Sequence, residues 1–174
     1  DQNKIIYYKD YIDMVLGHEL LHMASTIKHS RYYSSGFSKS LSFNGLNEGY
    51  TELLNRRKFF NENFQTPCYK INVFVLRILE LLLPNKELME DAYFHNDANF
   101  VYNSFCAYSS KQEFFTIMKY LDLFCDKIIE PDPKILDLAC EIVTRTNNAD
   151  KIKQAKDFTD EYLDTTKIKR KRLY

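Results

Sequence analysis

The sequence predicts one mainly α-helical domain with at most a small β element near residues 33–44. Its 174 residues suit one compact domain better than two. Glycine and proline number only four each, whereas sheet-rich folds need many turns and therefore many turn-forming residues. Hydrophobic residues make up 45% of the chain and aromatic residues 15%, which is enough apolar surface for a folded core and argues against disorder.

The N-terminal third predicts two helices separated by a long loop. Apolar side chains recur at helical spacing over residues 10–28, and no proline interrupts them. Residues 29–44 are rich in serine, glycine and aromatic side chains, which predicts a loop with a short hairpin around Ser35-Gly36. The second helix is predicted over residues 46–60, before the break at Thr66-Pro67.

The rest of the chain predicts six more helices, of which the first is strongly apolar and stops at Pro84. In the segment Pro131-Asp132-Pro133, Asp132 is a good N-cap and Pro133 suits the first helical position. The basic segment 167–174 is expected to be a solvated tail, with contact to nucleic acid or a membrane as the weaker alternative. The six predicted helices cover residues 72–83, 86–93, 98–108, 112–128, 133–144 and 149–163.

The charge balance and the cysteines exclude several classes of protein. Lysine plus arginine and aspartate plus glutamate both number 24, so we expect no nucleic-acid partner, which would call for a basic excess. The longest apolar run, residues 71–83, contains two charged residues and is too short to span a bilayer. No two cysteines form a C-x-x-C pair, which favours buried thiols in a reducing compartment and predicts a cytoplasmic protein. The cysteines are Cys68, Cys106, Cys125 and Cys140.

The stretch from His18 to His22 carries the strongest chemical signal, an H-E-x-x-H pattern inside a predicted helix. Residues four apart project from the same helix face, so the two imidazoles can hold one metal ion. Glu19 lies about 100° round the helix from His18 and therefore beside such a metal. There it can take a proton from a metal-bound water and pass it to a leaving amine.

A second motif downstream supplies the carboxylate that a catalytic zinc site needs. Such a site has three protein ligands and one open position for water. Glu48 and Glu52 are one helical turn apart at the start of the second predicted helix. One of the two can therefore bind the metal while the other orients a ligating imidazole.

The two motifs together resemble those of the gluzincin zinc metallopeptidases, the class that includes thermolysin and the M1-type aminopeptidases. Those families carry H-E-x-x-H on one helix and N-E-x-x-x-[DE] on a following helix. The resemblance covers about residues 15–56, and the N-E-G variant is closer to the aminopeptidase branch. It implies Zn²⁺ as cofactor, His18, His22 and Glu48 as its ligands, Glu19 as the general base, and Glu52 as the acid that holds a ligand histidine.

The resemblance also predicts how the domain is divided. Residues 1–66 would form a minimal zincin-like active-site region, residues 67–166 the helical C-terminal part of the same domain, and residues 167–174 a basic tail. Gluzincins place a small sheet before the active-site helix, and its edge strand pairs with extended substrate. With only 17 residues before His18, we expect that sheet to be absent, minimal or built partly from residues 37–43.

The function that follows is zinc-dependent hydrolysis of peptide bonds, with a peptide or protein as substrate. The alternative is a catalytically inactive, zincin-like helical binding module in which the metal is structural or absent. Tyr50 and His95, and by residue type also Tyr93 and Tyr102, are candidates for stabilising the oxyanion. His29 could replace Glu48 as third ligand, but two helical turns put it about 10 Å along the axis, so we expect it to end the first helix.

Overall fold

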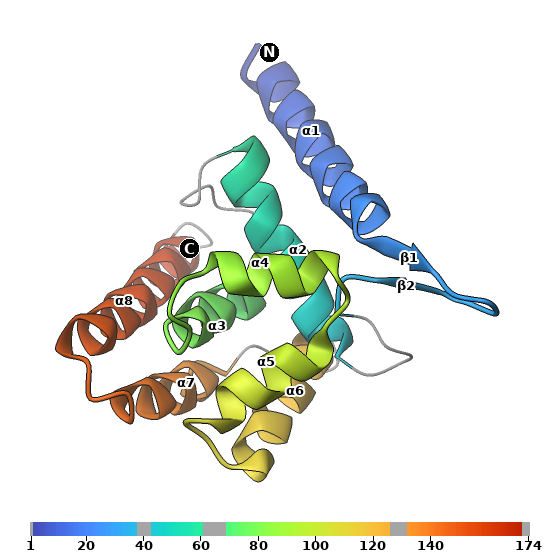
Figure 1. Cartoon of the computed structure of the whole chain (residues 1–174). Helices are drawn as coiled ribbons and strands as arrows, with labels where there is room; N and C mark the ends of the chain where they lie inside the picture. Colours follow the sequence, from blue (N-terminus) through green and yellow to red (C-terminus); the bar gives the residue numbers. More distant parts are fainter. Residues whose placement is uncertain (1, 38–42, 61–68, 126–131, 172–174) are drawn as a thin grey trace.

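A computed structural model of the chain describes residues 2–37, 43–60, 69–125 and 132–171, and these contain eight helices and one two-stranded antiparallel sheet (Figure 1). The predicted mainly helical fold with a small β element is therefore confirmed. The helices are α1 Gln2–Ala24, α2 Asn44–Phe59, α3 Lys70–Glu80, α4 Glu87–Phe94, α5 Ala98–Cys106, α6 Lys111–Cys125, α7 Lys134–Thr144 and α8 Ala149–Lys171. The strands are β1 Thr26–Lys28 and β2 Tyr33–Ser35.

Helices α2 and α3 form the centre of the core. Helix α2 packs against α1, α3 and α6, and α3 packs in addition against α7 and α8. Every residue from Ile71 to Glu80 is buried, as is typical of a helix surrounded by others. Helix α1 lies at the edge of this arrangement, next to α2 (Figure 1). The position of α1 therefore depends on its contact with α2.

A glycine permits the close approach of α1 and α2. A Cβ atom at Gly17 would collide with Oδ1 of Asn55 and would lie 2.9 Å from the Phe59 ring. The side-chain amide of Asn55 donates a hydrogen bond of 2.9 Å to the backbone carbonyl of Met14. These contacts fix α1 against α2 in the turn that precedes His18.

Helix α1 carries apolar side chains on both of its faces. Its inner face buries Met14 and Leu21, which are each 5% exposed. The apolar residues of the opposite face are between 44% and 71% exposed and have no cover among the described residues. They are Ile12, Leu16, Leu20 and Met23.

The first predicted helix differs from the observed one at both ends. Helix α1 begins at Gln2 and ends at Ala24, and residues 26–28 form a strand instead of the predicted last turn. The hydroxyl groups of Ser25 and Thr26 donate to the carbonyl of His22, at 3.2 and 2.7 Å, and thus satisfy it as the helix ends. The β-branched pair Thr26-Ile27 then pairs with Ser34 and Ser35.

The ends of the other helices lie close to the predicted ones, except at the C-terminus. Helix α8 continues to Lys171 instead of ending at residue 163, because neither glycine nor proline interrupts residues 149–171. It therefore includes the first part of the basic segment. The hairpin predicted around Ser35-Gly36 lies slightly earlier, and residues 38–42 lie outside the described part of the chain.

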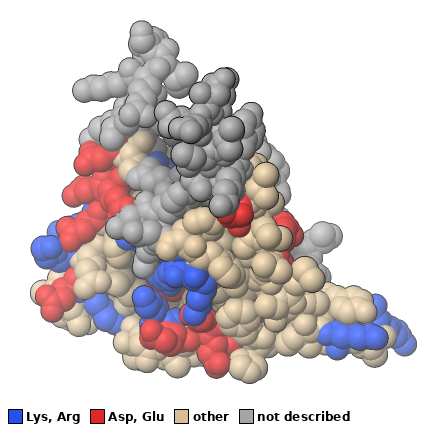
Figure 2. Space-filling view, turned by 90° about the horizontal axis from the view of Figure 1, so that it is seen from above, with Lys and Arg blue, Asp and Glu red and all other residues tan. Residues whose placement is uncertain are grey.

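The described cysteines are less buried than predicted, because Cys106, Cys125 and Cys140 are each half-buried. No disulfide joins Cys106, Cys125 and Cys140 to one another, and Cys68 lies outside the described residues. Within the described part of the chain, no helix has the length and apolar character needed to cross a bilayer. Figure 2 shows that Lys and Arg side chains on one face lie beside Asp and Glu side chains, apart from a basic tip on the hairpin side.

The contact at Gly17 makes a prediction about stability. Replacing Gly17 with alanine is expected to lower the free energy of unfolding by about 1–3 kcal/mol, because the new methyl group meets a buried amide and a ring. Chemical denaturation followed by circular dichroism measures this. Leu20→Ala, on the exposed face of the same helix, is the control and should lower the free energy of unfolding by less than Gly17→Ala does. A Gly17→Ala protein more stable than wild type, as helix propensity alone predicts, would contradict the close approach.

Candidate metal centre

Two imidazoles from α1 and one carboxylate from α2 converge on one point. Nε2 of His18 lies 3.1 Å from Nε2 of His22 and 3.2 Å from Oε2 of Glu48. Nε2 of His22 lies 3.3 Å from Oε1 of Glu48. Among the described residues, these three side chains form the one group of histidine, cysteine and acidic side chains whose ligand atoms all lie within 4.8 Å of one another.

The donor atoms of this cluster suit a zinc ion. Ligands bound at the usual 2.0–2.1 Å to a tetrahedral centre lie about 3.3 Å from each other. The two Nε2 atoms are 3.1 Å apart, and Glu48 approaches each of them with a different oxygen, Oε2 at 3.2 Å from His18 and Oε1 at 3.3 Å from His22. Two imidazole nitrogens and a carboxylate oxygen are also the donors that zinc prefers in catalytic sites, with the fourth position left for water. The donor set therefore fits the predicted zinc ion in chemistry, and its ligand atoms all lie within 4.8 Å of one another.

The hairpin holds the second histidine in place. The Ser35 hydroxyl donates to the backbone carbonyl of His22 at 2.8 Å and lies 3.4 Å from its Nδ1 atom. The hairpin is itself attached to the body of the protein, because the Asn96 side chain donates to the carbonyl of Ser25 and accepts from the Ser34 hydroxyl. The short β element therefore supports the C-terminal end of α1 where His22 lies.

A second carboxylate orients the first histidine. Oε2 of Glu52 lies 3.3 Å from Nδ1 of His18, and both residues are buried. A proton on Nδ1 that is donated to Glu52 leaves Nε2 free to bind a metal, which is the usual arrangement of a carboxylate behind a ligating histidine. Glu48 and Glu52 thus contact opposite nitrogens of the same ring.

The carboxylates change the acidity of the metal-free cluster. Burial alone would lower the pKa of His18, but hydrogen bonds to Glu48 and Glu52 and their negative charges outweigh burial and raise the pKa to about 9. Burial raises the pKa of Glu48, but its hydrogen bonds with His18 and His22 hold the pKa well below the usual range. The cluster is therefore built to place positive charge between two carboxylates.

A cavity of about 170 Å³ opens beside the cluster. Glu19, which is exposed, lines it together with His18 and Glu48, two of the candidate ligands. This places Glu19, which is not one of the three candidate ligands, on the wall of the same cavity. Met14, Val15, Glu52 and Tyr69 complete the lining.

Tyr69 is a cavity residue that the motifs did not identify. Its ring stacks on the His18 imidazole, with ring centroids 5.8 Å apart and an angle of 16° between the planes. It lies just before α3, after residues 61–68, and no spacing rule connects it to the H-E-x-x-H stretch. Arg56, by contrast, stands four residues after Glu52 on the same helix, and that spacing could have identified it as a partner of Glu52.

The proposed oxyanion candidates lie elsewhere, which corrects the expectation from residue type. Tyr50 is fully buried in the core, packed against Phe37 and Tyr93. His95 is exposed at the end of α4, where Nδ1 lies 2.9 Å from the carbonyl of Asp91. The other two do not line the described cavity either. Tyr93 is buried and its hydroxyl shares a hydrogen bond with that of Thr51, whereas Tyr102 is half-buried and packs on Phe114.

His29 also differs from its expected position. It does not end a helix but follows strand β1, in the turn of the hairpin. Its Nε2 atom lies 2.8 Å from the Ser34 hydroxyl, and its ring stacks on Tyr32. His29 is therefore no part of the described metal-ligand group.

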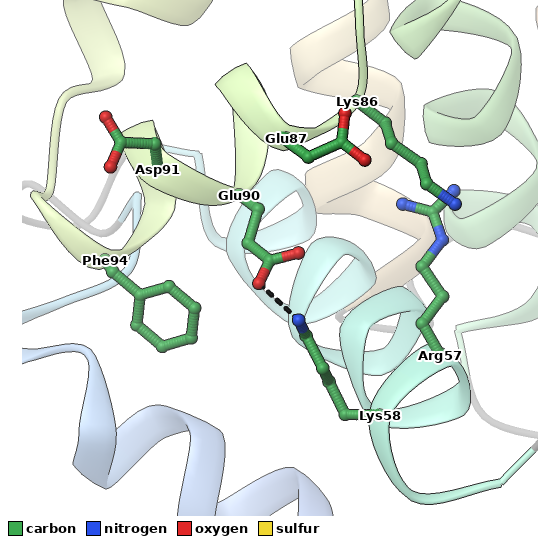
Figure 3. A pocket seen from close by; sticks show the side chains of 7 residues that line it. All are labelled: Arg57, Lys58, Lys86, Glu87, Glu90, Asp91 and Phe94. Carbon is green, nitrogen blue, oxygen red and sulfur yellow. Dashed lines mark ion pairs between the residues drawn. The ribbon is translucent and has the colours of Figure 1, made fainter.

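A larger hollow of about 450 Å³ lies between α2 and α4 (Figure 3). Positive and negative side chains line it in equal number, and Lys58 pairs with Glu90 across it. None of the three ligand residues is among the residues that line it, so it is separate from the metal centre. Its lining consists of Arg57, Lys58, Lys86, Glu87, Glu90, Asp91 and Phe94.

Comparison of the chain with protein-family models, with curated proteins and with solved structures finds no significant match. What the site can do is therefore judged from its geometry and from the chemistry of its side chains.

The geometry predicts which histidines bind metal. Replacing His18, His22 or Glu48 with alanine is expected to weaken zinc binding by more than about 100-fold, beyond the loss typical of outer partners, because each removes one of three ligands. Competition with a chromophoric chelator measures the affinity of the metal-free protein for Zn²⁺. His29→Ala and His95→Ala are the matched controls and should bind zinc like wild type. Equal losses in all four histidine variants would contradict the site.

Proposed function

We propose that the protein is a zinc-dependent peptidase of the gluzincin type. The observation that carries this proposal is the meeting of His18, His22 and Glu48 beside a cavity that also presents Glu19. A structural zinc site is normally closed by four protein ligands, whereas a catalytic one keeps a position open. Three ligands next to a cavity, with a further carboxylate at its edge, fit the catalytic kind.

Each side chain has a distinct task in this reaction. His18, His22 and Glu48 would hold Zn²⁺, which when bound lowers the pKa of water and polarises the scissile carbonyl. Glu19 takes the proton from the attacking water as its oxygen bonds to the carbonyl carbon, and delivers it to the amine nitrogen as the C–N bond breaks. Glu52 accepts from Nδ1 of His18 and keeps Nε2 directed at the ligand cluster.

The cavity wall favours an uncharged segment of the substrate near the reacting carbonyl. Met14 and Val15 from α1 form one part of the lining, and the ring of Tyr69 forms another. These side chains put apolar surface beside Glu19 and the candidate ligands, and apolar surroundings strengthen electrostatic interactions. A peptide bond, uncharged before attack, is suited to such a site.

Replacing Glu19 with glutamine tests the proposed base. The amide cannot accept the proton, so turnover of a peptide library is expected to fall by about 10²–10⁴-fold, while zinc affinity stays within about twofold of wild type because Glu19 is no ligand. Peptide cleavage followed by mass spectrometry and zinc titration give the two readouts.

Asp13→Asn is the matched control, since Asp13 is another exposed acid of α1 and does not line the cavity. It should leave both turnover and zinc affinity unchanged. Wild-type protein that binds zinc but cleaves no peptide, with Glu19→Gln indistinguishable from it, would contradict the peptidase and favour an inactive zinc-binding module.

A further inference from the structure

A chain of buried polar contacts runs from the metal centre into the core. Glu52 is 2% exposed and uses its two carboxylate oxygens for different partners. Oε2 faces Nδ1 of His18 at 3.3 Å, and Oε1 accepts a hydrogen bond of 3.1 Å from Nε of Arg56. A rotation of the Glu52 side chain would therefore break both contacts at once.

Arg56 is itself buried, with 3% of its surface exposed. Removing a carboxylate from water costs several kcal/mol unless an opposite charge and hydrogen bonds compensate. Arg56 is one helical turn after Glu52 on α2, and its planar guanidinium donates in a fixed direction. The arginine thereby holds Glu52 in the one orientation that also reaches His18.

Asn55 adds a third contact on the same carboxylate. Its side-chain amide lies 3.4 Å from Oε2 of Glu52 and donates to the carbonyl of Met14, four residues before His18. The amide thus connects the backbone of α1 to the carboxylate that contacts the His18 ring. Two residues of α2 therefore support the Glu52–His18 contact. Arg56 and Asn55 both contact the Glu52 carboxylate, and Asn55 also holds the α1 backbone near His18.

From this arrangement we infer that Arg56 is a positioning residue for the metal centre. It acts through Glu52, holding the carboxylate so that the His18 imidazole presents Nε2 to His22 and Glu48. Arg56 does not touch the cavity, whose lining residues do not include it. The inference rests on the proposed function, because it takes His18 to be a zinc ligand.

The test compares the affinity for zinc and the visible spectrum of the cobalt-substituted protein across five variants that circular dichroism shows to be folded. Arg57→Met is the matched control. Arg57 is the next residue on α2 and donates two hydrogen bonds, of 2.7 and 2.8 Å, to the buried carboxylate of Glu80, so its replacement also removes the arginine partner of a buried carboxylate. A merely structural role predicts similar behaviour for both arginines. The variants are Arg56→Met, Arg56→Lys, Arg57→Met, Glu52→Gln and the double variant Glu52→Gln/Arg56→Met.

We expect Arg56→Met to weaken zinc binding by about 10–100-fold and to alter the cobalt spectrum, as loss of an outer partner does. Arg57→Met should lower thermal stability and leave both metal readouts unchanged. In the Glu52→Gln background, Arg56→Met should weaken zinc binding by no more than about a further twofold, because the arginine acts through the carboxylate.

Wild-type zinc affinity in Arg56→Met, or an equal loss in Arg57→Met, would overturn the inference and leave the metal centre intact. If Arg56→Met does not fold, Arg56→Lys replaces it, since it keeps the buried charge and loses the planar donor. Unchanged zinc affinity in that variant would likewise overturn the inference. A wild-type protein that binds neither zinc nor cobalt would instead refute the proposed function itself.

Discussion

The packing of α1 against α2 around Gly17 brings the histidines of one helix against the glutamates of the other. A glycine at this point allows the side chain of Asn55 to reach the α1 backbone, one turn before His18. Both helices are long enough to present two chemical groups one turn apart, so one helix–helix contact aligns four side chains. The hairpin bonds to the end of α1, and residues of both helices line the cavity.

The site also illustrates what burial demands of charged groups. Glu52 and Arg56 are almost completely enclosed, and each is a charged partner of the other. Their pairing occupies space in the core that apolar side chains could fill more simply. The ion pair fixes the orientation of the Glu52 carboxylate. Because each of its oxygens has a partner, the carboxylate cannot turn away from the His18 imidazole without losing both. Further from the site, α2 and α3 meet through apolar side chains and the buried amide of Asn72, which donates to the carbonyls of Gly45 and Leu121.

The parts of this structure that sequence could predict depend on local spacing. Helical periodicity gave the eight helices, and two i, i+4 patterns gave the ligand atoms that the structure brings together, although the zinc ion and the chemistry remain proposals. Neither pattern specifies contacts between distant segments. Tyr69 reaches the cavity from the start of α3, and Tyr50, which by residue type was an equally good candidate, faces the core because α2 buries that side against Phe37 and Tyr93. Helix α1 ends earlier than predicted because the hydroxyl groups of Ser25 and Thr26 donate to the carbonyl of His22. Helical spacing alone does not reveal these hydrogen bonds.

Helix α1 is held to the rest of the protein mainly by one face, and its opposite face is apolar and exposed. Two of the three candidate ligand residues lie on this helix, and the third follows after 25 intervening residues. A metal ion bound by all three would therefore act as a cross-link that closes a loop of the chain. Because the three side chains come together only in the folded state, binding of the ion would stabilise that state over the unfolded chain, which does not hold it. The ion would thus contribute to keeping the N-terminal helix attached as well as to the chemistry beside it.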